Sequence, residues 1–367
     1  MIVAPLLSYF EDALSRFEEA QRRCGGGETK ALCVAGHPVS VQFAGNALVD
    51  DLTKALSHLP TSGSNGSPRL RIAAWDTASS GQELPDPPWA PGGGNAESPG
   101  TLGGEGEAGV WFVEGSRIRA TFDARSRLLS MLDPATGRGI LWIADHERLP
   151  FYETSMPFRN IFQWWLSSRG LQLVHAAAVA WGEGGVLIAG PAGAGKSTTA
   201  LCCLAAGFEF AGDDHVLVGD DPEFTVHGVW SSGKLEQDAL ALLPLFGPIV
   251  SNGAPREGEK GLVLLKDHFP QRLAGRFPLR AILLPQLRPD GPTRLIPASP
   301  SQVLAAWAPS SILQQKGSRR DAFLRLCRIV REIPGFILEA GPDPAQIPPL
   351  VRALLEQGPT RMNGRLP

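Results

Sequence analysis

The stretch GPAGAGKS, from Gly190 to Ser197, matches the phosphate-binding pattern G-x-x-x-x-G-K-[ST]. Its glycines let backbone N–H groups converge on phosphate oxygens. Lys196 can then reach the β- and γ-phosphates, and the Ser197 hydroxyl can bind Mg²⁺. We therefore expect a nucleoside triphosphate site for ATP with Mg²⁺, the purine preference being open. The nucleotide-binding residues expected in the loop are Gly190, Pro191, Ala192, Gly193, Ala194, Gly195, Lys196, Ser197 and Thr198.

The residues on both sides of the loop fit the strand-loop-helix context that the motif requires. Residues 185–189 are a short apolar run, which is typical of a buried strand. Residues 197–206 contain no glycine and end at Gly207, where a left-handed helix cap is expected. The positive end of that helix would face the phosphates. This context disfavours the alternative, a glycine-rich turn that binds no ligand.

Composition excludes several classes of protein. The chain has 367 residues, of which 43% are apolar, so it is globular rather than disordered. Its 34 basic and 37 acidic residues give a net charge of −3, which does not favour nucleic acid or an anionic membrane as a partner. Five scattered cysteines lack the spacing of a zinc site and indicate reduced thiols.

Targeting signals are not apparent in the sequence. The first twenty residues lack a basic leader and carry acids from Glu11 onward, so we expect no secretory signal. The apolar run over residues 171–181 is too short to span a bilayer and contains His175. These features predict a cytoplasmic protein.

The pattern of apolar residues divides the chain into two regions. Residues 1–150 are expected to form an α+β region that begins with an amphipathic helix and contains a β-meander over residues 110–143. A Gly/Pro-rich insert occupies about residues 78–108, and 13 of the 28 residues from Gly81 to Ala108 are Gly or Pro. Because such a density sustains neither helix nor strand, we expect a mobile loop there.

Residues 151–367 are expected to form the catalytic domain. Residues 171–181 read as one strand that turns into the strand before the loop, and residues 208–211 read as a strand after the loop helix. Strand, loop, helix and strand would form one right-handed crossover unit. Later strands and helices preserve this alternation, so the predicted fold class is α/β.

Asp213 and Asp214 are the candidate acids for phosphoryl transfer. They follow Lys196 by 17 and 18 residues, so they should emerge at the carboxyl end of a strand close to the loop. Two adjacent carboxylates repel each other, and a bound cation is the simplest relief. The alternative is a solvated turn with no catalytic role.

Residues 173–180 (LVHAAAVA), 185–208 (GVLIAGPAGAGKSTTALCCLAAGF) and 209–218 (EFAGDDHVLV) together resemble the catalytic domain of HPr serine kinase/phosphorylase. They resemble still more the HPr kinase-like proteins among lasso-peptide tailoring enzymes. The clear resemblance covers residues 171–220. It implies a P-loop kinase core related to the nucleotide-binding domain of phosphoenolpyruvate carboxykinase, in which one aspartate of the pair acts as the base on a serine hydroxyl.

The resemblance also implies roles for individual residues. Lys196 would grip the phosphates, and Ser197 would bind Mg²⁺. One of Asp213 and Asp214 would be the base, for which we favour Asp214, while the other would assist the metal or orient His175. His175 would be a proton partner or, alternatively, a hydrogen-bonded core residue. Lys234 and Lys260 are two further candidates, which could neutralise charge on the phosphates or the substrate. The alternative for each is an ordinary surface lysine.

Two departures limit the resemblance. The glycine-rich signature that follows the acid pair in HPr kinases is not recognisable in residues 227–237, HGVWSSGKLEQ, and the first 110 residues do not match that enzyme's N-terminal domain. HPr as acceptor, phosphorolysis and a hexamer are therefore not carried over. The expected function is transfer of the γ-phosphoryl of ATP to a hydroxyl, with a serine of a peptide or small protein as acceptor.

Two alternatives for the function remain open. One is a kinase for a small-molecule alcohol such as free serine or a sugar. The other is a nucleotide-binding regulatory module without an acceptor, which would need a water-positioning residue and mobile loops. The expected partners are the nucleoside triphosphate and the acceptor, and a homo-oligomer is left open.

Overall fold

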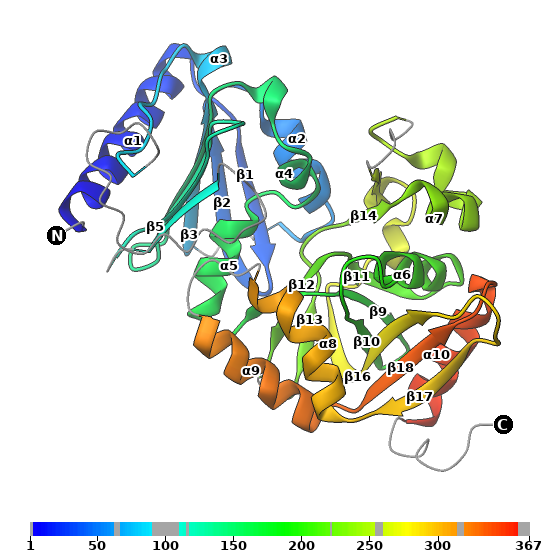
Figure 1. The fold of residues 1–367 in the computed structure, drawn as a ribbon. Helices are drawn as coiled ribbons and strands as arrows, with labels where there is room; N and C mark the ends of the chain where they lie inside the picture. The colour runs from blue at the N-terminus through cyan, green and yellow to red at the C-terminus, as the bar shows by residue number, and fades with distance from the viewer. Residues whose placement is uncertain are drawn as a thin grey trace. The chain divides into compact units, whose positions relative to one another are not determined.

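The computed structural model describes residues 3–61, 67–89, 110–114, 117–220, 222–253, 260–313 and 319–358. The chain divides into two compact units, Met1–Arg169 and Gly170–Pro367, and each is mixed α/β with its own mixed sheet (Figure 1). The sequence places the division between residues 150 and 151, whereas the structure places it after Arg169. The reason is that helix α5 packs in the first unit, where the rings of Trp165 and His37 lie 5.5 Å apart.

The described residues of the first unit form a seven-stranded sheet in the order β1-β2-β3-β7-β6-β5-β4. Strands β4 to β7 pair antiparallel as the predicted meander, and β7, β3 and β2 pair parallel. The strands are β1 (Thr29–Val34), β2 (His37–Phe43), β3 (Leu70–Asp76), β4 (Val110–Glu114), β5 (Arg119–Asp123), β6 (Leu128–Asp133) and β7 (Arg138–Ile143). The helices are α1 (Val3–Arg23), α2 (Val49–Thr53), η1 (Lys54–Leu56), α3 (Thr77–Ser80), η2 (His146–Arg148), α4 (Phe151–Ser155) and α5 (Arg159–Ser167).

The amphipathic first helix is present as predicted, since buried side chains of α1 join the core of this sheet. The Gly/Pro-rich insert lies largely outside the described residues, which resume at Val110. At its start, the Asp76 carboxylate accepts a hydrogen bond of 2.8 Å from the Ser79 backbone N–H and so caps the short helix α3.

The described residues of the second unit form a nine-stranded sheet with the path β11-β9-β10-β16-β13-β12-β8, in which β18 pairs with both β16 and β17. A separate hairpin joins β14 and β15. The strands are β8 (Gln172–His175), β9 (Ala177–Trp181), β10 (Gly184–Ile188), β11 (Glu209–Gly212), β12 (His215–Gly219), β13 (Thr225–His227), β14 (Ser232–Leu235), β15 (Gly261–Leu264), β16 (Arg276–Leu287), β17 (Arg294–Ala298) and β18 (Gly335–Ala340). The helices are α6 (Lys196–Ala205), α7 (Gln237–Leu242), η3 (Pro244–Ile249), η4 (Leu265–Asp267), η5 (Pro270–Arg272), α8 (Pro300–Leu313), α9 (Arg319–Glu332), η6 (Pro344–Gln346) and α10 (Ile347–Gln357).

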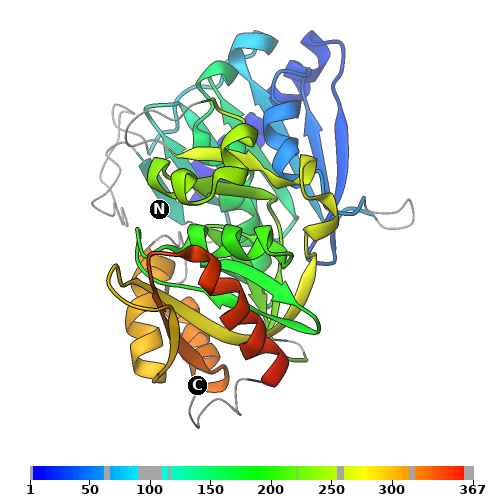
Figure 2. The same cartoon turned by 90° about the vertical axis from the view of Figure 1, so that its right-hand side faces the viewer.

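Helices cover both faces of this sheet, as Figures 1 and 2 show. Val186 and Ile188 of β10 point into the core shared with α6 and α10, whereas Leu187 points into the core shared with α8 and α9. This alternation is the two-residue period of a strand buried on both sides. The second unit is therefore a three-layer α/β/α arrangement.

One predicted strand is wrong. Residues 171–181 form two strands, β8 and β9, with Ala176 between them. β8 pairs with β12, whereas β9 lies between β10 and β11 and runs antiparallel to both. The strands on either side of the loop helix are therefore parallel to each other but separated by one strand.

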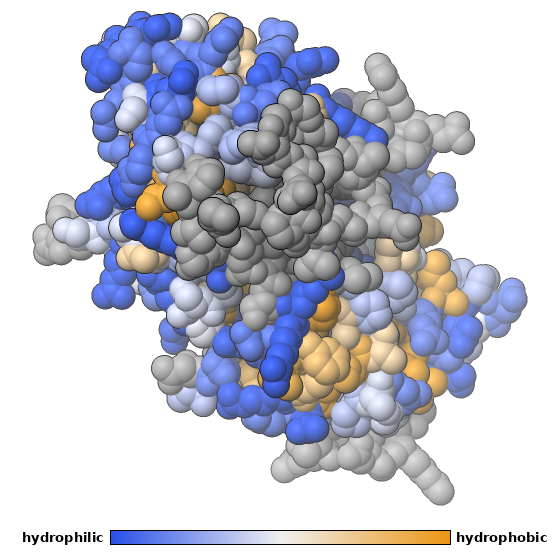
Figure 3. Space-filling view, turned by 60° about the vertical axis from the view of Figure 1, so that its left-hand side comes forward, coloured by the Kyte–Doolittle hydropathy of each residue, from blue (hydrophilic) through white to orange (hydrophobic). Residues whose placement is uncertain are grey.

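Some hydrophobic side chains reach the surface, as the space-filling view illustrates (Figure 3). Among the residues that the structure describes, the exposed large hydrophobic ones are Phe151, Leu242, Leu245, Leu287, Phe323 and Leu324. Of the helices that the structure describes, none combines the length and the apolarity needed to span a lipid bilayer. All five cysteines are free thiols.

Candidate active site

The phosphate-binding loop connects β10 to α6 in the second unit. Gly190, Gly193 and Gly195 have φ of 142°, 75° and 95°, in the region that favours glycine. Gly195 is also the N-cap residue of α6, in the left-handed conformation. Glycine adopts these conformations at little cost because it lacks a Cβ, so the glycines of the motif favour this turn into the helix.

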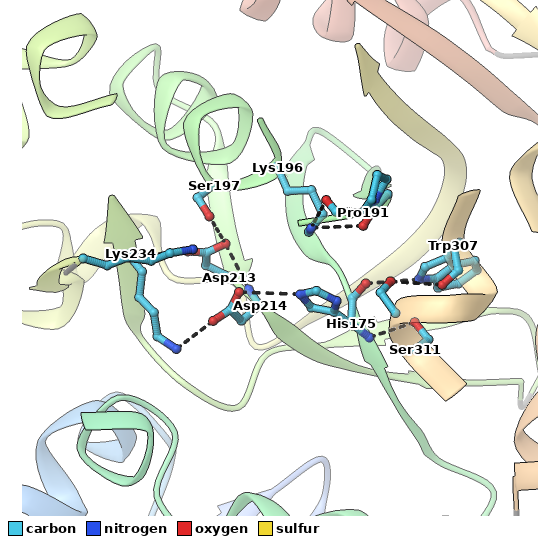
Figure 4. A network of polar contacts seen from close by, with 12 residues as sticks. His175, Pro191, Lys196, Ser197, Asp213, Asp214, Lys234, Trp307 and Ser311 are labelled. Carbon is cyan, nitrogen blue, oxygen red and sulfur yellow. Dashed lines mark hydrogen bonds and ion pairs between the residues drawn. The ribbon is translucent and has the colours of Figure 1, made fainter. Parts of the chain in front are cut away.

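The Lys196 side chain is folded across the loop. Its ammonium donates hydrogen bonds to the carbonyl oxygens of Gly190, at 3.0 Å, and Pro191, at 2.8 Å (Figure 4). Burial lowers the pKa of this ammonium, and the charges of Asp214 and Asp213 oppose that shift. The positive charge of Lys196 thus lies within the loop, where the motif predicts that phosphates bind.

The carboxylate of Asp213 connects helix α6 to the backbone of Asp214 and to strand β14. Its Oδ1 accepts hydrogen bonds from the Ser197 hydroxyl at 2.8 Å and from the Asp214 N–H at 2.9 Å. Its Oδ2 accepts the Lys234 backbone N–H at 3.0 Å. Both carboxylate oxygens are therefore engaged, and the side chain is buried.

Asp214 lies beside Asp213 but has a different environment. Its Oδ2 accepts a 2.6 Å hydrogen bond from the Lys234 ammonium, and its Oδ1 is 3.7 Å from Nε2 of His175 (Figure 4). The Asp214 side chain retains 23% exposure. Its φ of 65° is unusual for a residue with a side chain.

The two carboxylates are shifted in opposite directions. Burial, followed by the charge of Asp214, raises the pKa of Asp213 to about 6 against the hydrogen bonds from Lys234 and Ser197. Burial also acts to raise the pKa of Asp214, but the neighbouring His175 ring, the charges of Lys234 and His215 and the hydrogen bond from Lys234 outweigh it and hold that pKa well below its ordinary value. Asp214 is therefore the acid that stays ionised.

His175 is held from behind by helix α8. Its backbone N–H donates to Oγ of Ser311 at 3.1 Å, and its carbonyl accepts from Nε1 of Trp307 at 3.2 Å. Its ring lies 5.5 Å from the ring of His215, the residue opposite it on β12. The histidine predicted from the sequence thus lies next to Asp214, within a buried framework.

Lys260 is one of the residues that line a cavity beside the phosphate-binding loop. Its ammonium is 3.5 Å from Oε1 of Glu236, and its side chain is 42% exposed. The cavity has a volume of about 120 Å³. It is lined by His175, Ala192, Gly193, Gly195, Lys196, Ser197, Thr198, Asp214, Lys234, Leu235, Glu236, Ala239 and Lys260.

The structure therefore brings most of the candidate residues to one place. Asp213 accepts a hydrogen bond from Ser197, which lines this cavity, and the carbonyls of Gly190 and Pro191 accept hydrogen bonds from Lys196. Sequence reasoning missed Glu236, Ser311 and Trp307. Glu236 lies two residues after Lys234 and could have been found there, whereas the other two carry no local signal.

The oxygen donors at the loop suit Mg²⁺. The Ser197 hydroxyl and the Asp213 carboxylate are hard ligands of the kind that Mg²⁺ prefers, and they are already 2.8 Å apart. Within the described residues, there is no group of three or more His, Cys, Asp and Glu that could hold a metal ion. The donor set fits an ion that takes one or two protein oxygens and completes its shell with phosphate and water.

Comparisons with known proteins give distant structural similarity. No model of a known family and no curated protein matches the chain. Among solved structures, the chain is similar to the Hpr(Ser) kinase/phosphatase from Coxiella burnetii, with 13% identity and a TM-score of 0.30. The similarity covers 53% of this chain and 99% of that one.

Proposed function

We propose that the second unit is an ATP-dependent kinase of the HPr kinase type, which transfers the γ-phosphoryl group to a hydroxyl, with a serine of a peptide or small protein as acceptor. The observation that carries this proposal is the hydrogen bond of 2.8 Å between Ser197 and Asp213, because it joins the phosphate-binding loop to the acid pair. The resemblance of residues 171–220 to HPr kinases supports the same reaction.

The loop and Lys196 would bind the triphosphate. Backbone N–H groups at the start of α6 and the Lys196 ammonium, on leaving the carbonyls of Gly190 and Pro191, would contact phosphate oxygens. Ser197 and Asp213 would hold Mg²⁺, which when bound neutralises charge on the β- and γ-phosphates.

Asp214 would act as the base toward the acceptor. Its carboxylate takes the hydroxyl proton as the acceptor oxygen forms a bond to the γ-phosphorus, and the bond between that phosphorus and the β,γ-bridging oxygen breaks to release ADP. Lys234 and His175 hold the carboxylate in place on both sides. Positioning and electrostatics supply most of the catalysis in such transfers.

Asp214 is favoured over Asp213 because of access. Asp214 lines the cavity, whereas Asp213 is buried and both of its oxygens accept hydrogen bonds. A base must first reach the proton that it removes, and only then does its pKa matter. Asp213 is therefore assigned to the metal and Asp214 to the proton.

The test is a transfer assay with the purified chain, Mg-ATP and a panel of serine-containing peptides, small proteins, free serine and sugars. We expect ADP release coupled to a product that gains one phosphoryl group, detected by mass spectrometry. The matched inactive control is Asp214→Asn. Nucleotide binding without any phosphorylated product across the panel would contradict the kinase assignment and favour a regulatory module.

A further inference from the structure

Leu287 is an exposed leucine beside the phosphate-binding loop. It is the last residue of β16, which runs parallel to β10, and it is 63% exposed. A Cβ placed on Gly195 would lie 3.8 Å from Cδ2 of Leu287 and 3.9 Å from Cβ of Pro285. The loop and the end of β16 therefore border each other directly.

Leu287 belongs to the face of the sheet that α6 covers. Ala281 and Leu283 of β16 join the core shared with α6, and the two-residue period carries this row on to Leu287. Its partner on β18, Ala340, lies in the same core. The row of apolar side chains under the loop helix therefore continues to the surface at the carboxyl edge of the sheet.

The acid pair and Leu287 border the loop at different residues. Asp213 accepts the hydroxyl hydrogen bond of Ser197, in the first turn of α6, whereas Leu287 borders Gly195, the residue just before that helix. A triphosphate with its γ-phosphate at Asp214 would direct its other end across the loop, toward β16. Ligands of open α/β sheets bind at this carboxyl edge.

We propose that Leu287 is a nucleoside-contact residue, which packs against the aromatic base of the bound nucleotide. A single exposed leucine is uninformative by itself, but this one lies where the base of a nucleotide held by the loop would leave the phosphates. The inference rests on the proposed nucleotide binding. It concerns the face of the site away from the transferred phosphoryl group.

The test compares Mg-ATP with Mg-tripolyphosphate, which lacks the nucleoside, by isothermal titration calorimetry. Leu287→Ala is expected to weaken ATP binding about tenfold because it removes apolar contact area. The same variant is expected to bind tripolyphosphate as tightly as the wild type. Leu287→Met, which keeps the volume, should restore ATP binding, and Phe323→Ala, which truncates a 43% exposed side chain on α9, should change neither ligand.

The outcomes separate this inference from the function on which it rests. Unchanged ATP binding by Leu287→Ala, or equal weakening of both ligands, would overturn the contact assigned to Leu287. Equal affinity of the wild type for ATP and tripolyphosphate would do the same, since the nucleoside would then contribute nothing. A wild type that binds neither ligand would overturn the nucleotide site itself.

Discussion

Each unit has a buried aspartate where a strand ends, and the two are stabilised differently. Asp133 ends β6 in the first unit and accepts the N–H groups of Ala135 at 3.1 Å and Thr136 at 3.4 Å. Asp213 follows β11 in the second unit and accepts the N–H groups of Asp214 and Lys234. The two differ in the neighbouring charge with the largest effect, which is the Arg117 guanidinium at 2.6 Å for Asp133 and the Asp214 carboxylate for Asp213.

The pKa values reflect this difference. Burial acts to raise the pKa of Asp133, but the hydrogen bonds from Arg117 and Thr136 outweigh it and lower that pKa. Burial and Asp214 together raise the pKa of Asp213. An acid paired with arginine stabilises the fold, whereas two adjacent acids with one shared lysine retain negative charge for a cation. The pairing of Asp133 with Arg117 therefore indicates a structural role, whereas the adjacent acids Asp213 and Asp214 indicate a functional site.

The largest effect is expected at Lys196, the buried lysine of the site that contains Asp213 and Asp214. Lys196→Ala should reduce phosphoryl transfer on the order of a thousandfold or more, because the phosphates lose their buried cation. The measurement is the steady-state rate of ADP release with saturating acceptor. Retention of near-normal turnover would mean that the loop does not bind the reacting phosphates.

The second effect separates catalysis from binding. Asp214→Asn should lower kcat about a hundredfold while the Kd for Mg-ATP stays within about threefold, since the amide cannot accept the proton. Rapid-quench kinetics and calorimetry measure the two quantities. Asp133→Asn is the control and should leave kcat unchanged. If Asp214→Asn transfers phosphoryl groups normally, the base is Asp213 or another group.

The third effect concerns the stability of the first unit. Asp133→Asn should lower the free energy of unfolding by about 2 kcal/mol, because a buried acceptor of Arg117 and of the turn is weakened. Denaturant titration measures the change. Asp86→Asn is the control, since Asp86 pairs with Arg127 at the surface and should cost no more than about 0.5 kcal/mol. Equal losses in both variants would refute the distinction drawn for Asp133.

The smallest effect is a pH dependence in the first unit. Glu153 is buried on α4, and burial raises its pKa to about 7 despite Arg159 and the hydrogen bond from the Phe158 N–H. A carboxyl with a raised folded-state pKa stabilises the fold most at low pH, and stability is lost as the pH rises toward that pKa. Between about pH 6 and pH 7 the wild type should lose about 1 kcal/mol relative to Glu153→Gln. Parallel stability curves for the two proteins would exclude this role for Glu153.

Local sequence signals account for the elements that place the site. The loop, the helix that follows it and the acid turn were predicted because glycines and apolar runs determine backbone conformation over a few residues. The split of residues 171–181 into β8 and β9 was not, because an apolar run rich in alanine contains no signal for Ala176 as a break. The position of β9 between β10 and β11 depends on strand pairing, which a local pattern does not encode.

Contacts between distant parts of the chain account for what the sequence missed in the site. Ser311 and Trp307 reach His175 from α8, across separations of 136 and 132 residues. Their positions follow from the packing of α8 on the sheet, for which no motif exists. The opposite pKa shifts of Asp213 and Asp214 depend likewise on Lys234 and His175, which only the folded chain brings to the turn.

The left-handed backbone at Asp214 opposes stability to the activity proposed for this residue. At a φ of 65° a residue with a Cβ is less stable than glycine by about 1 kcal/mol. Glycine there would relieve the strain and remove the carboxylate in one step. Under the proposed role of Asp214 as the base, selection for heat resistance alone would favour an inactive protein at this position, and an engineered thermostable form should be assayed for turnover as well as for its melting temperature.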